Sequence, residues 1–162
     1  MDSFYAHGGT QLYGTPRNKA AESRTVRPAR RQEFRFEAET ARTNLRALEH
    51  LEANWDGYGA QVLSKAVRLN AWACLDKALN LSLVPDVLPT PEGTISFEWE
   101  IDEFEAHLQI GRTSYSMYIR SPDGPSQYYN GEMKEGPDRA LQSLRRVIDE
   151  RNGVTGASFT LG

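Results

Sequence analysis

The sequence predicts an α+β fold: an N-terminal arm, an αα-hairpin, an antiparallel sheet of three to four strands, and a C-terminal helix packed on one face of the sheet. Apolar residues recur at three- and four-residue spacing before residue 85 and again after 137, and they alternate with polar residues over 95–119. Because these helical and strand patterns are grouped, the strands are expected to pair antiparallel with the helices on one face. The length, 162 residues with one cysteine, suits one domain without disulfides.

Residues 1–33 are predicted to form a basic, flexible arm ahead of a single domain at 34–162. The arm is rich in Gly, Thr, Ser, Arg and Pro and shows no sustained period, a composition that buries little apolar surface. Its basic residues are candidate contacts for nucleic acid or for an acidic surface: Arg17, Lys19, Arg24, Arg27, Arg30 and Arg31.

Two helices follow the arm. The first is expected from about Glu33 to near Asn54, with Ala38, Ala41 and Leu45 on its apolar face. The second begins after Ser64, a good N-cap, and ends before Pro85. The residues that it is expected to bury are Val67, Ala71, Cys74, Leu75, Ala78 and Leu79.

A turn sequence joins the two helices, and we interpret it as a structural corner. Its two glycines can adopt positive φ, and the Asp side chain can cap the turn through the adjacent backbone. The two aromatic residues are expected to plug the corner. The corner residues are Trp55, Asp56, Gly57, Tyr58 and Gly59.

Alternating patterns predict strands over 95–101, 104–110 and 114–119, and a fourth is expected over 126–133. Turns at Asp102-Glu103 and Gly111-Arg112 would connect the first three as a meander. Pro137 suits the first turn of a last helix that ends at Asn152-Gly153.

The first hairpin carries an unusual arrangement of charge. A two-residue loop at Asp102-Glu103 places Glu100 opposite Glu105, and like charges directly opposite each other destabilise a sheet. We interpret this polar face as a docking surface for a basic partner. A solvated face that aids solubility, or carboxylates paired with the basic arm, are the alternatives. The predicted partner-binding residues are Glu98, Glu100, Glu105, His107 and Tyr118.

Two short segments of the sequence resemble the corresponding segments of a group of small bacterial proteins. The corner Trp-Asp-Gly-Tyr-Gly-Ala at 55–60, followed by a helix and by the Pro-Thr-Pro to Glu-Trp segment at 89–99, is similar to theirs. The resemblance covers about residues 40–110. It implies a compact domain and a bacterial or phage origin, because such proteins are common on mobile elements and beside defence or toxin genes. No activity is established for the group, so it implies no catalytic residue.

No signature of catalysis stands in the sequence. The three histidines are not near the cysteine, and neither a His-x-x-x-His pattern nor a phosphate-binding glycine loop is present. We therefore expect a protein that is not an enzyme and that needs no cofactor or metal. Without a long apolar run or a signal peptide, a cytoplasmic protein with no membrane contact is expected.

The predicted function is that of a non-catalytic bacterial or phage regulator or inhibitor. It would bind a basic surface of a protein partner, for example a nucleic-acid-handling defence complex, through the acidic sheet face. The alternative is a nucleic-acid-binding accessory or antitoxin-like protein that acts through the basic arm. A homo-oligomer, in which each arm embraces a neighbour's sheet, is the third reading.

Overall fold

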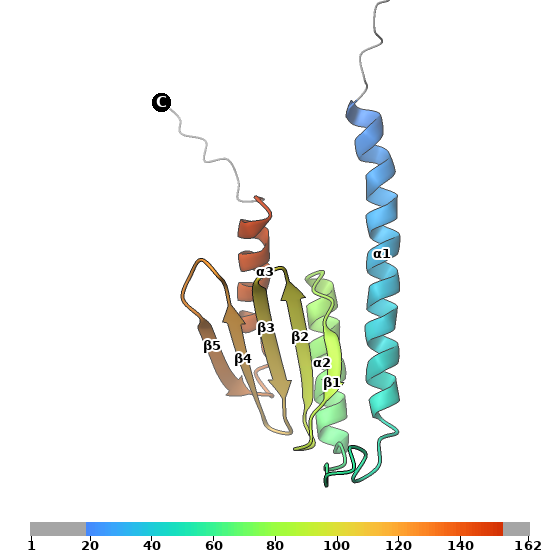
Figure 1. The fold of residues 1–162 in the computed structure, drawn as a ribbon, viewed down its shortest axis with the longest axis vertical. Coiled ribbons are helices and arrows are strands. Elements are labelled where there is room, and N and C mark those ends of the chain that lie inside the picture. Colours follow the sequence, from blue (N-terminus) through green and yellow to red (C-terminus); the bar gives the residue numbers. More distant parts are fainter. Residues whose placement is uncertain (1–18, 154–162) are drawn as a thin grey trace, which may run out of the picture. The chain divides into compact units, whose positions relative to one another are not determined.

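The computed structural model describes residues 19–153, with side chains from residue 28 onward. The chain divides into two compact units, Met1–Gln32 and Glu33–Gly162. The described elements, labelled in Figure 1, are α1 (Lys19–Leu48), α2 (Lys65–Asn80), β1 (Asp86–Pro89), β2 (Ile95–Ile101), β3 (Phe104–Ile110), β4 (Ser114–Arg120), β5 (Gln127–Glu132) and α3 (Asp138–Arg151). The predicted α+β class is confirmed, with five strands instead of three to four.

Helix α1 starts much earlier than the sequence pattern predicted. Its backbone is helical from Lys19, so the expectation of a non-helical arm over 1–33 is wrong for residues 19–33. Alanine, glutamate, lysine and arginine have high helix propensity and outweigh Pro28, which stands inside the helix. Residues 1–18, and with them Arg17, lie outside the described part of the chain.

The sheet is a simple antiparallel meander in the order β1-β2-β3-β4-β5. Its register confirms the predicted hairpin, because Ile101 pairs with Phe104, and Glu100 lies opposite Glu105. Strand β1 was not predicted. It has four residues, lies just after one proline and ends at another, so its alternation is too short to stand out.

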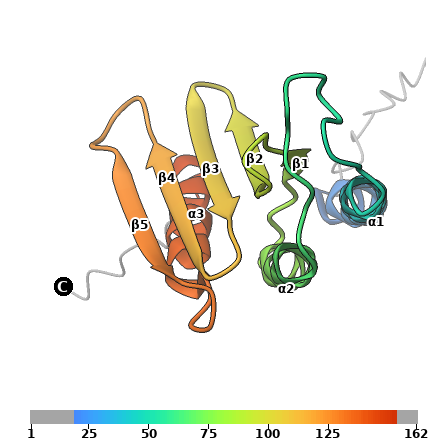
Figure 2. The same ribbon diagram turned by 90° about the horizontal axis from the view of Figure 1, so that it is seen from below.

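The apolar face of the sheet and the helices share one hydrophobic core. The largest buried side chains include Phe97 and Leu108 from the sheet, Leu75 from α2 and Leu141 from α3. All six residues of α2 that were expected to be buried are buried, and the Ser64 hydroxyl caps the helix by accepting from the amide of Val67. Figure 2 shows α2 and α3 beside the sheet.

The second half of α1 packs against the rest of the second unit, Glu33–Gly162. Ala38, Ala41 and Leu45 are buried in the core, as predicted, although the helix ends at Leu48 and not near Asn54. Beyond its end, Glu49 accepts a hydrogen bond of 2.7 Å from the indole nitrogen of Trp72 in α2.

The corner after α1 is held by its own polar side chains. Asp56 Oδ1 accepts from the amides of Tyr58 (2.8 Å) and Ala60 (3.0 Å), which lowers the pKa of its carboxyl group, the bond from Tyr58 contributing most. Gly57 and Gly59 have φ values of +76° and +95°, as the predicted turn required. The expectation that Tyr58 plugs the corner is wrong, since this side chain is 95% exposed.

Candidate functional site

The polar face of the sheet carries a continuous row of functional side chains. Register pairs Asp86 of β1 with Glu98 of β2, Glu98 with His107 of β3, His107 with Tyr118 of β4, and Tyr118 with Tyr128 of β5. Residues directly opposite in a sheet share a face, so the row crosses all five strands. It places two carboxylates beside one imidazole and two phenols.

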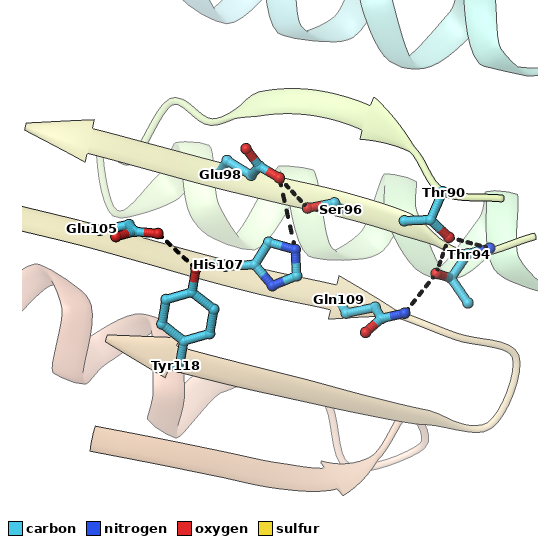
Figure 3. Close-up of polar contacts among 8 residues, drawn as sticks. All are labelled: Thr90, Thr94, Ser96, Glu98, Glu105, His107, Gln109 and Tyr118. Carbon is cyan, nitrogen blue, oxygen red and sulfur yellow. Dashed lines mark hydrogen bonds and ion pairs between the residues drawn. The ribbon is translucent and has the colours of Figure 1, made fainter. Parts of the chain in front are cut away.

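Glu98 is held in place from two sides. Its Oε1 accepts a hydrogen bond of 3.0 Å from the hydroxyl of Ser96, and it lies 3.7 Å from Nε2 of His107, as Figure 3 shows. Ser96 is 2% exposed and is the buried polar residue on this strand. The Glu98 carboxylate is therefore oriented on the sheet rather than free to rotate into solvent.

Glu105 is compensated within the sheet. Its Oε1 accepts a hydrogen bond of 2.8 Å from the phenol of Tyr118, and its Oε2 pairs with the guanidinium of Arg120 (Figure 3 shows the first of these contacts). Register places Arg120 directly opposite Glu105. Glu105 was predicted as a partner-binding residue, and its negative charge is partly compensated by the chain's own Arg120.

Tyr118 links this pair to the histidine. The rings of His107 and Tyr118 stack with centroids 5.4 Å apart and 20° between their planes. Partial burial, followed by the hydrogen bond to Glu105 and the charges of Glu105 and Glu98, raises the pKa of the Tyr118 phenol. The phenol thus stays protonated and keeps donating to Glu105 at neutral pH.

Among the carboxylates on the strands of the hairpin, Glu98, Glu100 and Glu105, Glu100 is the exposed one. Within the part of the chain that the structure describes it has no ion pair, and its neighbour across the hairpin, Glu105, is turned to Arg120. Pairing of Glu105 relieves the like-charge opposition that the sequence suggested. The uncompensated charge therefore concentrates on β2 and β1 rather than on β3.

The five predicted partner-binding residues come together in space. They line one shallow cavity of about 320 Å³ on the polar face, where the backbone of β3 completes the floor. The cavity residues are Glu98, Glu100, Glu105, Ala106, His107 and Tyr118. Sequence reasoning thus placed these side chains on one surface.

A second cavity, of about 290 Å³, lies beside the first and shares Glu98 and Glu100 with it. Its other wall comes from α1, chiefly Phe36, Glu37 and Thr40, and from the segment leading into β1. Sequence reasoning missed the α1 residues, because nothing in the linear pattern says which strand edge this helix lies against. Arg120 could have been found, since it continues the polar alternation of β4.

The basic residues of the first unit are only partly described. Lys19, Arg24, Arg27, Arg30 and Arg31 all belong to α1, and the side chains of Arg30 and Arg31 are exposed. A contact between these residues and the acidic face remains a prediction.

Other chemical groups are poorly placed for reaction in the described residues. Cys74 is 1% exposed, and burial raises the pKa of its thiol to about 12, so it is a packing residue. Among residues 28–153, no group of three His, Cys, Asp or Glu side chains is arranged to hold a metal ion. No helix in the described part of the chain is long and apolar enough to cross a membrane.

Comparisons with models of protein families, with curated proteins and with solved structures found no match to the chain. The resemblance at 55–60 and 89–99 therefore stays a prediction.

Proposed function

We propose that this protein acts by stoichiometric, non-catalytic binding of a basic surface on a partner protein, through the polar face of its sheet. The observation that carries the proposal is the arrangement of Glu98 and Glu100. Both carboxylates line the same open cavity; Glu98 accepts a hydrogen bond from Ser96 and lies 3.7 Å from His107, and Glu100 is exposed. Carboxylates held in a fixed geometry are suited to guanidinium and ammonium groups.

The charge of the surroundings supports the same partner. Asp86 and Glu37 add two carboxylates to the neighbouring cavity, and no Lys or Arg lines either cavity. An approaching basic surface would be attracted over a distance of about 10 Å at moderate salt. Such complementarity raises the association rate and suppresses acidic partners.

The same face offers aromatic surface that can exclude water from the charged contacts. Tyr128, at the end of the row, is 73% exposed, and Tyr118 lies beside it. Tyrosine is enriched among residues that dominate binding energy at protein interfaces. A regulatory or inhibitory role, in a bacterial or phage setting, is the form of this proposal that the sequence resemblance favours.

The test is a comparison of charge-reversed variants on the identified partner. Proteins captured from the source cells by the wild-type chain are purified, and their affinity is measured across a salt series. Glu98→Lys with Glu100→Lys should weaken binding at least a hundredfold. Glu135→Lys with Glu150→Lys is the matched control, because both residues are exposed and line neither cavity. Equal affinity for the two double variants would overturn the proposal.

Nucleic-acid binding through α1 is the second candidate. The observation that favours it is the pair of exposed arginines, Arg30 and Arg31, in the basic first unit of the chain. Replacing both by glutamine in the full chain should weaken the electrophoretic shift of labelled DNA or RNA. The slope of log affinity against log salt should fall by the equivalent of about two phosphate contacts. No shift with either nucleic acid at low salt would exclude this candidate.

A further inference from the structure

The edge of strand β2 is left open where it passes α1. Strand β1 pairs with β2 only from Ile95 to Glu98, whereas β2 continues to Ile101. On the β1 side, residues 99–101 have no pairing strand within the part of the chain that the structure describes. The cavity of about 290 Å³ occupies this position, and residues 36–44 of α1 form its far wall. We call it the edge groove.

The backbone at this edge is ready to pair. Asp102-Glu103 is a two-residue turn, so Ile101 and Phe104 form the closing hydrogen-bonded pair of the hairpin. Hydrogen-bonded and non-hydrogen-bonded pairs alternate along antiparallel strands. The amide and carbonyl of Glu100 therefore point away from β3, toward the edge groove, where an added strand could satisfy both.

Acidic and apolar side chains of β2 line the edge groove, and the alternation of the strand places them on opposite faces of the sheet. Glu98 and Glu100 stand on the polar face, while Trp99 and Ile101 stand on the opposite face. Phe36 of α1 is 75% exposed and Ile101 is 37% exposed, although both are large hydrophobic residues. Covering these two side chains would remove apolar surface from water.

The Trp99 indole nitrogen is one of three buried side-chain donors without a partner in the described structure, together with those of Trp55 and Arg68. Trp99 lines the edge groove and is only 4% exposed. Buried polar groups in folded proteins nearly always have a partner.

We propose that the edge groove receives an extended segment of the partner protein, added as a strand beside Trp99–Ile101, in which arginine or lysine alternates with apolar residues. A residue directly opposite Glu100 shares its face, so its basic side chain would meet the carboxylates of Glu98 and Glu100. The flanking residues would point to the other face, toward Ile101. This inference rests on the proposed function, because the two cavities share both glutamates.

Charge complementarity favours this occupant over others. The edge groove is lined by Glu37, Asp86, Glu98 and Glu100 and by no basic side chain. A nucleic-acid strand would be repelled by these four carboxylates. Pairing of a strand with an exposed sheet edge is an established mode of peptide recognition, in which backbone bonds supply affinity and alternate side chains supply specificity.

The test uses three fluorescein-labelled pentapeptides and fluorescence anisotropy with the full chain. The alternating probe is Val-Arg-Val-Arg-Val. The block probe, Arg-Arg-Val-Val-Val, has the same composition and charge without the alternation. The methylated probe carries N-methyl groups on the backbone nitrogens of both arginines of the alternating probe, which removes their donors but keeps every side chain.

The alternating probe should bind about tenfold more tightly than the block and methylated probes. Ile101→Ser should erase the preference over the block probe, whereas Tyr58→Ser, which truncates an exposed side chain outside the edge groove, should leave it intact. Circular dichroism and thermal unfolding of the variants check that each is folded.

Three outcomes would overturn the inference. Equal binding of all three probes, lost in the Glu98→Gln and Glu100→Gln variant but not with Ile101→Ser, would reject strand addition and leave the proposed function standing. Failure of all probes to bind, or binding that ignores both glutamates, would reject the two together. A dimer of the free chain that Phe36→Ser dissociates in ultracentrifugation would assign the edge groove to a second copy instead.

Discussion

Tyr118 donates a hydrogen bond of 2.8 Å to Glu105 across neighbouring strands, and this contact decides how charge is distributed on the polar face. Together with Arg120 it occupies both carboxylate oxygens of Glu105. The binding charge of the face is thereby left to Glu98 and Glu100.

Tyr118→Phe should remove the hydrogen bond to Glu105 and lower the free energy of unfolding by about 1 kcal/mol at neutral pH. The pKa of Tyr118 is raised above 10.0, mainly by burial, so the folded chain holds this proton more tightly than the unfolded chain does. Stabilisation from this group is complete below pH 10 and is lost as the pH rises through the raised value.

Urea unfolding between pH 9 and 11.5 measures this loss. The wild-type chain should lose stability more steeply with alkaline pH than Tyr118→Phe. Tyr115, whose pKa is also raised by burial, contributes to the slope in both proteins and so cancels in the comparison. Identical slopes would contradict the role assigned to Tyr118.

Arg120→Gln should strengthen binding of basic ligands, because it releases the charge of Glu105 into the cavity that Glu98 and Glu100 line. We expect a few-fold gain in affinity for the alternating probe at low salt, which shrinks as salt rises. Anisotropy titrations at two salt concentrations measure the gain. A matched charge change at Arg146, which is exposed on α3, should leave affinity within twofold, and an equal gain there would indicate net charge alone.

Gly131→Ala should destabilise the β4–β5 pair. A β-carbon at residue 131 would lie 2.7–2.9 Å from two ring carbons and the hydroxyl oxygen of Tyr115, whose side chain packs against the core. Displacing this ring should reduce the free energy of unfolding by about 1–3 kcal/mol. Chemical unfolding of the single variants and of a double variant with Tyr115→Val should show that the loss depends on the ring. Gly124→Ala, with open space around its β-carbon, is the neutral control.

Cys74 should be inert toward thiol reagents in the folded chain. Burial raises the pKa of its thiol to about 12, so the thiolate fraction at pH 8 is roughly a thousandfold lower than for an unperturbed cysteine. Reaction with a disulfide reagent should therefore appear only as the chain opens in denaturant. Rapid labelling under native conditions would show that the core does not close over Cys74 of α2.

The strands and helices with clear periodicity were predictable, and so was the hairpin register that brings Glu98, Glu100 and His107 to one face. Local spacing determines all of these. Strand β1 was missed because four residues give no measurable period, and the early start of α1 was missed because propensity, not periodicity, drives it.

The sequence predicted which side chains share the polar face, but not which of their charges are paired. Whether Glu105 is free depends on Arg120, fifteen residues away, which meets it only once β3 and β4 pair. The edge groove depends on where Phe36 of α1 lies against β2, a tertiary relationship that carries no signal in the linear sequence.

Amide chemical-shift mapping with the alternating probe tests the central claim most directly. Titration of the isotopically labelled chain should shift the amides of Glu98–Ile101 most strongly, with smaller changes at His107 and Tyr118. Saturation at these positions would locate a basic ligand on β2 and its neighbours. Shifts confined to α1 before residue 33, or no shifts at millimolar probe, would contradict the view that this acidic strand is where the molecule meets its partner.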